Sequence, residues 1–205
     1  MRLISYNLMN GGEGRADPIA EVLLGRSPDV VGLHEATDDA VLRRIAARLR
    51  MAFVVADGPG GRVALLSRLP ILETANVGAI FDSQMPILDA TLDVGGGVEL
   101  SVRVAHLFDR GEAGRMAQLL AEKVPHAMLM SYEPPLGKRV VDGVVTSAEA
   151  PLPATMQSPV RQLDEVLAAR DVRVLETWAE QDRLAYYASD HLPSGAAIEL
   201  TEVSE

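Results

Sequence analysis

Residues 188–193 read Ala-Ser-Asp-His-Leu-Pro, and the apolar run of residues 195–200 follows them directly. The length and composition of that run are typical of a strand. The carboxyl group of Asp190 and the imidazole of His191 therefore stand side by side at the entrance of the predicted strand. An acid next to an imidazole in this position is a compact acid/base pair.

Two further polar residues stand at the ends of apolar runs near the start of the chain. Glu35 follows the apolar run of residues 29–34, and Asn7 falls near the end of the run of residues 2–8. Carboxylates bind hard cations, and amides can contact phosphate oxygens. Strand ends are where a sheet protein often carries such groups, so the sequence predicts a functional site there.

Length and composition fit one globular domain over residues 1–205, in which 48% of the residues are hydrophobic. Only 4% are aromatic, so we expect an aliphatic core. The chain has no cysteine, which excludes disulfides, thiolate metal sites and a cysteine nucleophile. We see no leader-like segment and no apolar run of about 18 residues, and we therefore expect a cytoplasmic protein without a membrane span.

The net charge of −10 bears on possible partners. Proteins that bind the phosphate backbone usually show a basic face, and single-strand binders add aromatic stacking platforms. Here the charge balance is acidic and aromatics are scarce, so binding of duplex nucleic acid is disfavoured. The sequence does not determine the oligomeric state.

The hydropathy pattern predicts strands interspersed with a few helices, which indicates an α/β or α+β layered fold. Strands are predicted at about residues 2–8, 29–34, 52–56, 62–67, 71–76, 86–93, 98–106, 126–130, 172–177 and 195–200. One helix is predicted at about residues 17–24, with Asp17 as its cap, and a second runs from a cap at residues 37–39 to Leu49. A third helix is predicted at about residues 112–124. Residues 131–159 read as loop with one short strand at 139–145, and the pattern of residues 160–170 fits helix and strand equally.

Taken in order, several motifs resemble those of the endonuclease/exonuclease/phosphatase superfamily, which has a deoxyribonuclease I-like fold. The motifs are Ser5-Tyr6-Asn7-Leu8, residues 29–35 ending in His34-Glu35, residues 63–71, Val104-Ala105-His106-Leu107 with Arg115 and Gln118, Arg161-Gln162-Leu163-Asp164, and Ser189-Asp190-His191-Leu192-Pro193. Each motif alone is weak, but the ordered set spans almost the whole chain. The resemblance implies two packed, mostly antiparallel β-sheets flanked by helices in a four-layer sandwich.

The resemblance also implies a function, the hydrolysis of phosphodiesters or phosphomonoesters. Glu35 and Asp190 would bind Mg²⁺ or Mn²⁺, and Asn7 and His106 would contact the phosphate. His191, oriented by Asp164, would act at the reacting phosphorus or its nucleophile. A hard cation is suited to this hydrolysis, and so is a histidine that a carboxylate holds in one tautomer.

Three features depart from the family pattern. The family carries Gly-Asp-Phe-Asn after the strand that ends here at Met130, but this chain continues Ser131-Tyr132-Glu133. Ser131 is a poor base, and Glu133 is a possible substitute ligand. His34 stands where the family usually has Gln, and we expect it to point away from Glu35 and to pack rather than bind. The chain is also short for the family.

Three hypotheses follow from these observations. The first is a metal-dependent phosphoesterase that acts on a small or lipid-like phosphate ester rather than duplex DNA. The second is a non-catalytic member of the fold that binds a metal or ligand, as the missing Asp and Asn would suggest. The third is a nuclease, which would show salt-sensitive affinity for DNA.

Overall fold

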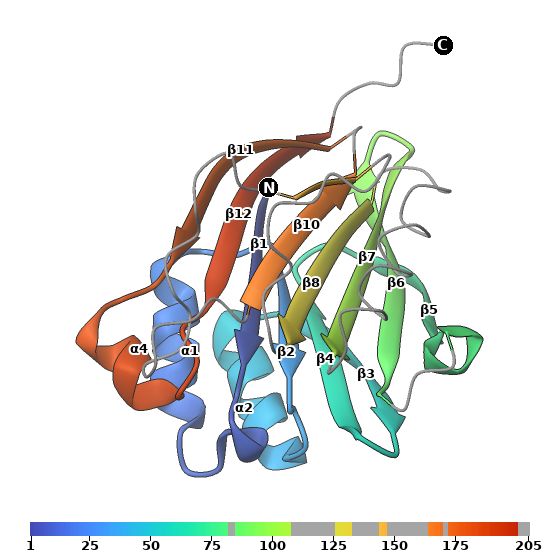
Figure 1. The fold of residues 1–205 in the computed structure, drawn as a ribbon. Helices are drawn as coiled ribbons and strands as arrows, with labels where there is room; N and C mark the ends of the chain where they lie inside the picture. The colour runs from blue at the N-terminus through green and yellow to red at the C-terminus, as the bar shows by residue number, and fades with distance from the viewer. Residues whose placement is uncertain (82–84, 108–125, 133–143, 147–163, 170–171, 201–205) are drawn as a thin grey trace.

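Two six-stranded β-sheets pack face to face and form the body of the protein (Figure 1). The computed structural model describes residues 1–81, 85–107, 126–132, 144–146, 164–169 and 172–200. Most neighbouring strands are antiparallel, and the β1–β2 and β7–β8 pairs are parallel. The prediction of two packed, mostly antiparallel sheets is therefore confirmed.

The first sheet has the N-terminal strand near its centre. Its strands, in spatial order, are β11 (Val172–Ala179), β12 (Ser194–Leu200), β1 (Arg2–Asn7), β2 (Val30–His34), β4 (Gly61–Ser67) and β3 (Ala52–Gly58). Strand β1 pairs with β2 on one side and with β12 on the other, so the two ends of the described chain meet here. This pairing brings the start of β12 beside the end of β1.

The second sheet contains a hairpin whose turn carries the three glycines of residues 95–97, each with a positive φ. Its strands, in spatial order, are β5 (Ile71–Asn76), β6 (Ile87–Gly95), β7 (Val98–Leu107), β8 (His126–Tyr132), β10 (Asp164–Ala169) and β9 (Val144–Thr146). The ambiguous stretch at residues 160–170 thus contains a strand, and β9 overlaps the end of the short strand predicted at 139–145. The helix predicted at residues 112–124 lies outside the described residues.

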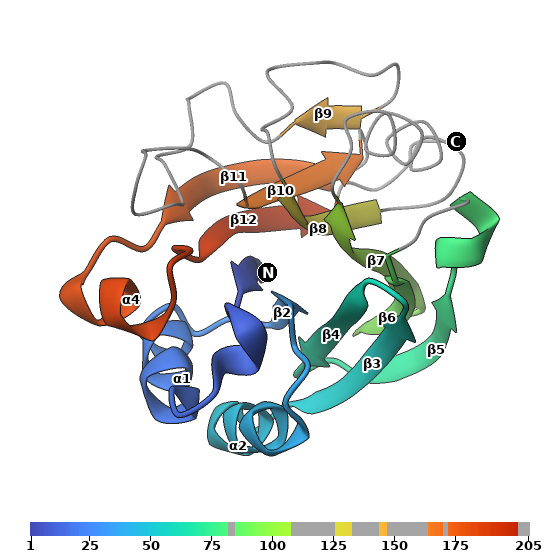
Figure 2. The same ribbon diagram turned by 60° about the horizontal axis from the view of Figure 1, so that its bottom comes forward.

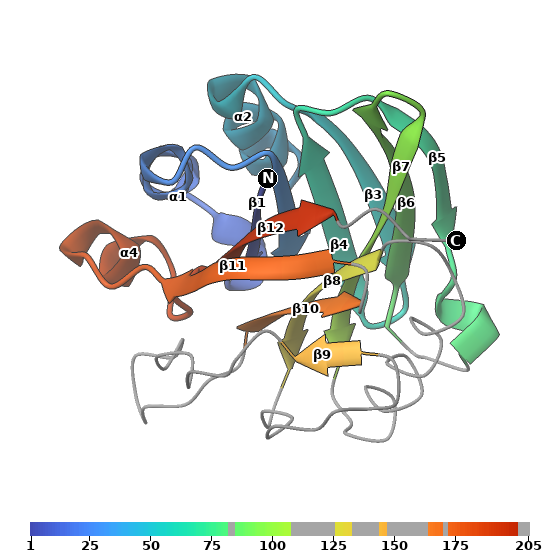
Figure 3. The same ribbon diagram turned by 90° about the horizontal axis from the view of Figure 1, so that it is seen from above.

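Helices cover the outer face of the first sheet (Figure 3). They are α1 (Ala16–Gly25), α2 (Asp39–Leu49) and α4 (Arg183–Ala188); two short 3₁₀ turns, η1 (Asn10–Gly12) and η2 (Gly78–Phe81), also occur. Sequence analysis missed α4 because six residues are too few for a clear helical period, although Asp182 accepts a capping bond from the Ala185 N–H at 2.7 Å. None of the helices within the described part of the chain is long and apolar enough to cross a bilayer.

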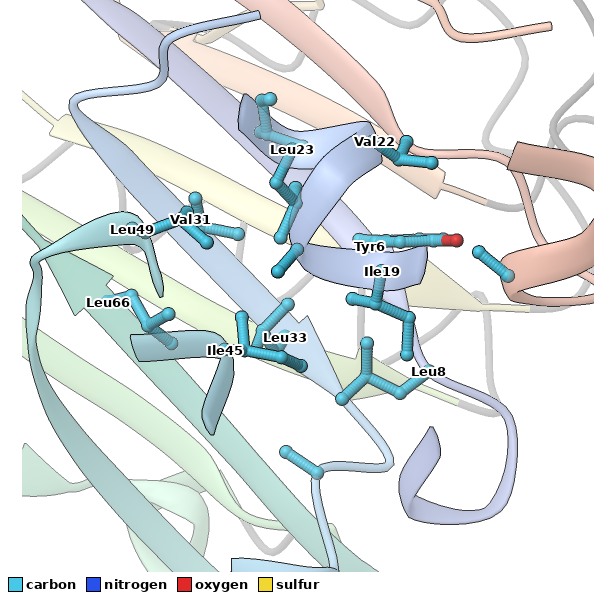
Figure 4. Packing of buried hydrophobic residues seen from close by; sticks show 14 of the residues in the cluster. Tyr6, Leu8, Ile19, Val22, Leu23, Val31, Leu33, Ile45, Leu49 and Leu66 are labelled. Atoms are coloured by element: carbon cyan, nitrogen blue, oxygen red, sulfur yellow. The ribbon is translucent and has the colours of Figure 1, made fainter. Parts of the chain in front are cut away.

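The strands sort their side chains by the alternation that strand geometry imposes. In β1, Ile4 and Tyr6 face the helices, where they pack with Ile19 and Ile45 (Figure 4). Leu3 faces the other way and joins the core between the two sheets, together with aliphatic residues of β6 and β7. Two cores therefore pack against the two faces of the first sheet. Both are mainly aliphatic, as expected from the low aromatic content.

The cap of the first helix lies two residues earlier than predicted, which corrects the role of Asp17. Arg15 occupies the cap position without a side-chain cap bond, and Asp17 lies in the first turn. The Asp17 carboxylate instead accepts bonds from Arg44 and Arg48 of α2, whose guanidinium groups lower its pKa to about 2. Arg44 and Arg48, which with Arg43 form an exposed basic face of α2, are therefore engaged in ion pairs between the helices.

Gly195 has no room for a side chain because the ring of Trp178 lies on it. The two residues are cross-strand partners in β12 and β11, and a Cβ built on Gly195 would lie 2.5 Å from Cζ2 of Trp178. We expect Gly195→Ala to destabilise the protein by about 1–3 kcal/mol through overpacking. Chemical denaturation followed by fluorescence of Trp178, the chain's one tryptophan, measures this loss.

The matched control is Gly25→Ala at the end of α1, where an added Cβ would meet nothing within 4 Å. Its free energy of unfolding should stay unchanged or rise slightly, because alanine favours the helix. Equal stability of the two variants would contradict the packing argument.

Candidate active site

The candidate site lies at the edge of the first sheet where β1 and β2 end and β12 begins (Figure 2). The parallel register of β1 and β2 pairs Asn7 with His34, so these strands finish side by side. Residues 189–191 lead into β12, which pairs with β1 on its other edge. The fold therefore brings together the polar residues at the ends of three predicted strands.

Glu35 is held in a fixed position directly after β2. Its φ of 53° is left-handed, which turns the chain at the end of the strand. Its carboxylate accepts a bond from Asn7 Nδ2 at 3.1 Å on one oxygen and from the Asn10 backbone N–H at 2.7 Å on the other. Each carboxylate oxygen is therefore held by a hydrogen bond, and the orientation of the carboxylate is fixed.

The charge of Glu35 is favoured despite its half-buried position. Burial raises its pKa, but the bonds from Asn10 and Asn7 and the nearby imidazoles of His106 and His191 outweigh burial and lower the pKa below its usual value. Glu35 is therefore ionised at neutral pH, and its carboxylate is suited to a hard cation.

Asn7 connects Glu35 with the loop before β12. Its Oδ1 accepts the Met9 backbone N–H at 2.9 Å, which fixes the orientation of the amide. Its backbone carbonyl accepts a bond from Ser189 Oγ at 2.8 Å. The same hydroxyl oxygen accepts the His191 backbone N–H at 3.3 Å and lies 3.4 Å from an oxygen of Asp190. Ser189 thus fixes the Asp190–His191 pair against the end of β1.

Two further imidazoles lie between the sheets at this edge. The His34 and His106 ring centroids are 6.0 Å apart, and His34 Nε2 lies 2.9 Å from Ser5 Oγ. His34 is fully buried and its Nδ1 has no hydrogen-bond partner. Burial, helped by the nearby His106 and His191, lowers the His34 pKa well below its usual value, so the ring is neutral.

Of the remaining predicted residues, Asp164 is placed by the backbone of the second sheet. The register aligns His106 of β7 with Ser131 of β8, and Ser131 with Asp164 of β10. Neighbouring strands lie about 4.8 Å apart, so Asp164 is about 10 Å from His106 along this row. Glu133 lies outside the described residues.

The structure thus gathers Asn7, Glu35, His106, Asp190 and His191 in one neighbourhood. Sequence analysis missed the contributions of Asn10 and Ser189, whereas His34 is buried, in agreement with the expectation that it packs. Asn10 lies in the 3₁₀ turn η1, which packs closely: a Cβ on Gly11 would lie 2.8 Å from Thr37 Oγ1, and the φ of Gly11 is 76°. The paired glycines were the available signal, since they allow the turn that aims the Asn10 N–H at Glu35.

A cation at this site would have few protein ligands. Among the residues that the structure describes, no group of three or more His, Asp or Glu side chains could hold a metal. Glu35 is the ionised oxygen donor, and Asp190 is a second carboxylate attached to the same network through Ser189. Mg²⁺ commonly binds through one or two carboxylates and keeps several waters, so this donor set fits such an ion.

No family model and no curated protein matches the chain, but many solved structures do. An endonuclease/exonuclease/phosphatase from Bacteroides vulgatus is 15% identical with a TM-score of 0.78, covering 97% of this chain and 98% of that one. Humanized D. rerio TDP2 is 16% identical with a TM-score of 0.75, covering 97% and 98%. The human Nocturnin catalytic domain with bound sulfate is 15% identical with a TM-score of 0.75, covering 98% and 93%.

These matches define the class of fold. The chain has the two-sheet sandwich shared by endonuclease/exonuclease/phosphatase structures, over nearly its whole length. The deoxyribonuclease I-like fold predicted from the motifs is therefore confirmed.

The buried, neutral His34 should make the fold sensitive to acid. Its folded pKa is depressed, so its contribution to stability is complete above the ordinary histidine pKa of about 6.5 and is lost as the pH falls below it. The expected loss is at most about 1.4 kcal/mol per pH unit. We expect His34→Gln, whose amide can still bond to Ser5, to reduce this loss in denaturant unfolding at pH 7 and pH 5. An identical loss in both proteins would contradict the assignment.

Asn7→Ala should raise the pKa of Glu35 toward its ordinary value, because one of the bonds to the charged form disappears. In the wild type the lowered pKa stabilises the fold above the ordinary glutamate pKa, and this stabilisation is lost as the pH falls through the lowered value. The variant should show less of it. NMR titration of the Glu35 side-chain carbon measures the pKa directly, and a value that stays or falls would refute the role of Asn7.

Proposed function

We propose that the chain is a divalent-cation-dependent hydrolase of phosphate esters. The main support is that Asn7, His106 and His191, which come from three distant segments, lie close to the ionised carboxylate of Glu35. The fold class agrees with this proposal. The Nocturnin structure of the same fold holds a sulfate, which is a tetrahedral oxyanion like phosphate.

Glu35 would hold Mg²⁺ or Mn²⁺, with Asp190 as the second carboxylate. The bound ion would neutralise charge on the phosphoryl oxygens and polarise a water. The bonds from Asn7 and Asn10 leave lone pairs on the Glu35 oxygens, because a carboxylate offers about four acceptor sites. The carboxylate is thus oriented before an ion arrives, and this lowers the entropic cost of binding.

The imidazoles and the amide would act on the phosphate itself. Asn7 and His106 would contact phosphate oxygens, and His191 would transfer a proton at the attacking or leaving oxygen. His191 is suited to this role because the segment that carries it is fixed by Ser189 to the end of β1. Asp164 is the acid proposed to orient His191, and the register of the second sheet aligns it with His106 through Ser131.

Charge favours a small or lipid-like substrate over duplex DNA. The net charge is −10, and Arg44 and Arg48 of the basic helix face are already paired with acids of α1. Strong association with the DNA backbone requires arginines and lysines that replace counterions. A shift in gel mobility with DNA at low salt would favour the nuclease hypothesis instead.

We expect Glu35→Gln and His191→Ala each to lower Mg²⁺-dependent hydrolysis of a chromogenic phosphodiester by at least about 100-fold. The first change removes the ligand charge and the second removes the proton-transfer group. Glu73→Gln is the matched control, because Glu73 is an exposed acid of β5 in the second sheet. Unchanged turnover in Glu35→Gln or His191→Ala would refute the assignment.

The alternative function is binding of a metal or ligand without turnover. It is favoured by Ser131, a poor base, at the place where the resembled family carries a catalytic Asp, in the row of His106 and Asp164. Calorimetric titration with Mn²⁺ beside the activity screen separates the two proposals. Binding that needs Glu35, with no turnover of any phosphate ester, would support the alternative.

A further inference from the structure

Arg15 binds two segments that carry candidate site residues. It occupies the cap position of α1, where its backbone is fixed by a bond from its N–H to the Gly12 carbonyl at 2.9 Å. Its guanidinium group donates to the carbonyl of Ala188 at 2.5 Å. The same group donates to the carbonyls of Leu8 at 2.9 Å and Met9 at 2.5 Å.

These carbonyls stand directly beside the polar groups of the site. Leu8 and Met9 follow Asn7, which binds Glu35, and Ala188 precedes residues 189–191. Arg15 thus joins segments that are far apart in sequence, since Arg15 and Ala188 are 173 positions apart. Besides the bond from Ser189 to Asn7, it is a second link between the end of β1 and the start of β12.

The Ala188 carbonyl needs a donor from outside its own helix. Ala188 is the last residue of α4, where helical carbonyls lack partners within the helix. The Met9 carbonyl also accepts the Gly12 N–H at 3.1 Å, so Arg15 adds a second bond there, at a residue with a costly left-handed φ of 53°. A guanidinium group is planar and carries five donors, so it can hold several carbonyls at fixed angles with charge-assisted bonds. Lysine has one small charged head and cannot reproduce that geometry.

We propose that Arg15 is a positioning residue, which sets the spacing between the Asn7–Glu35 pair and the Asp190–His191 pair. It acts through the backbone of the segments that it binds and does not touch the substrate. The inference rests on the proposed function for its effect on turnover, but the positioning itself is a property of the protein alone. Misplacement of a reacting group by about 1 Å can cost about 100-fold in rate.

The experiment compares Arg15→Ala and Arg15→Lys with Arg44→Ala as the control. Arg44 is a largely exposed arginine that binds the same helix α1, and its hydrogen bonds go to Asp17 and not to either site segment. The first readout is the NMR signals of the imidazoles of the four histidines. His126 is an internal reference, because it begins β8 and pairs with Ser101, at the end of the strand away from Ser131.

We expect the His191 signal to shift in Arg15→Ala, to shift less in Arg15→Lys, and to stay in place in Arg44→Ala, while the His126 signal stays in place throughout. Low millimolar guanidinium should move the His191 signal of Arg15→Ala back toward its wild-type position. Where turnover is measurable, kcat should fall about 10- to 100-fold with KM little changed, because ground-state binding is largely kept.

The outcomes separate this inference from the proposed function. A wild type without turnover would count against the proposed function, while the imidazole signals would still test Arg15. A His191 signal that is unmoved in a folded Arg15→Ala, or in Arg15→Lys if the alanine variant does not fold, would overturn the inference. Equal shifts in Arg15→Ala and Arg44→Ala would also overturn it, because they would indicate a general effect of α1.

Discussion

The candidate site depends on the bonds that keep the Glu35 carboxylate charged at a half-buried position. Burying a charge is costly unless it is paired and hydrogen-bonded. Here the Asn10 N–H and the Asn7 amide each donate to one oxygen, and the surrounding imidazoles add a favourable potential, so the net effect lowers the pKa. The donors are the last residue of β1 and a residue of the turn that follows it, so the charge at the end of β2 depends on the parallel pairing of these two strands.

That pairing is in turn secured by the two cores. The central strand β1 sends Ile4 and Tyr6 into the core under the helices and Leu3 into the core between the sheets. A register slip by one residue would exchange these faces and expose or bury the wrong side chains. The core therefore fixes the alignment of Asn7 with His34, and with it the reach from Asn7 to Glu35.

The sequence predicted what is local or ordered along the chain and missed what depends on tertiary contacts. Alternating apolar residues located the strands, and the order of motifs identified Asn7, Glu35 and His191 as neighbours. The role of Arg15 could not be predicted, because its bond to Ala188 joins residues 173 positions apart and has no motif. Residues 160–170 were ambiguous because their apolar spacing suits either period, and pairing of β10 with β8 selects the strand.

His34 shows how packing supports the electrostatics of the site. A positive charge on His34 would be buried and would lie near the imidazoles of His106 and His191, which disfavour it. Full burial keeps His34 neutral, and its bond with Ser5 satisfies one ring nitrogen while Nδ1 is left without a partner. Leaving a buried polar atom unpaired costs about 1–3 kcal/mol. The fold therefore contains a local cost at His34, and the neutral ring adds no positive charge to the group of imidazoles that it forms with His106 and His191.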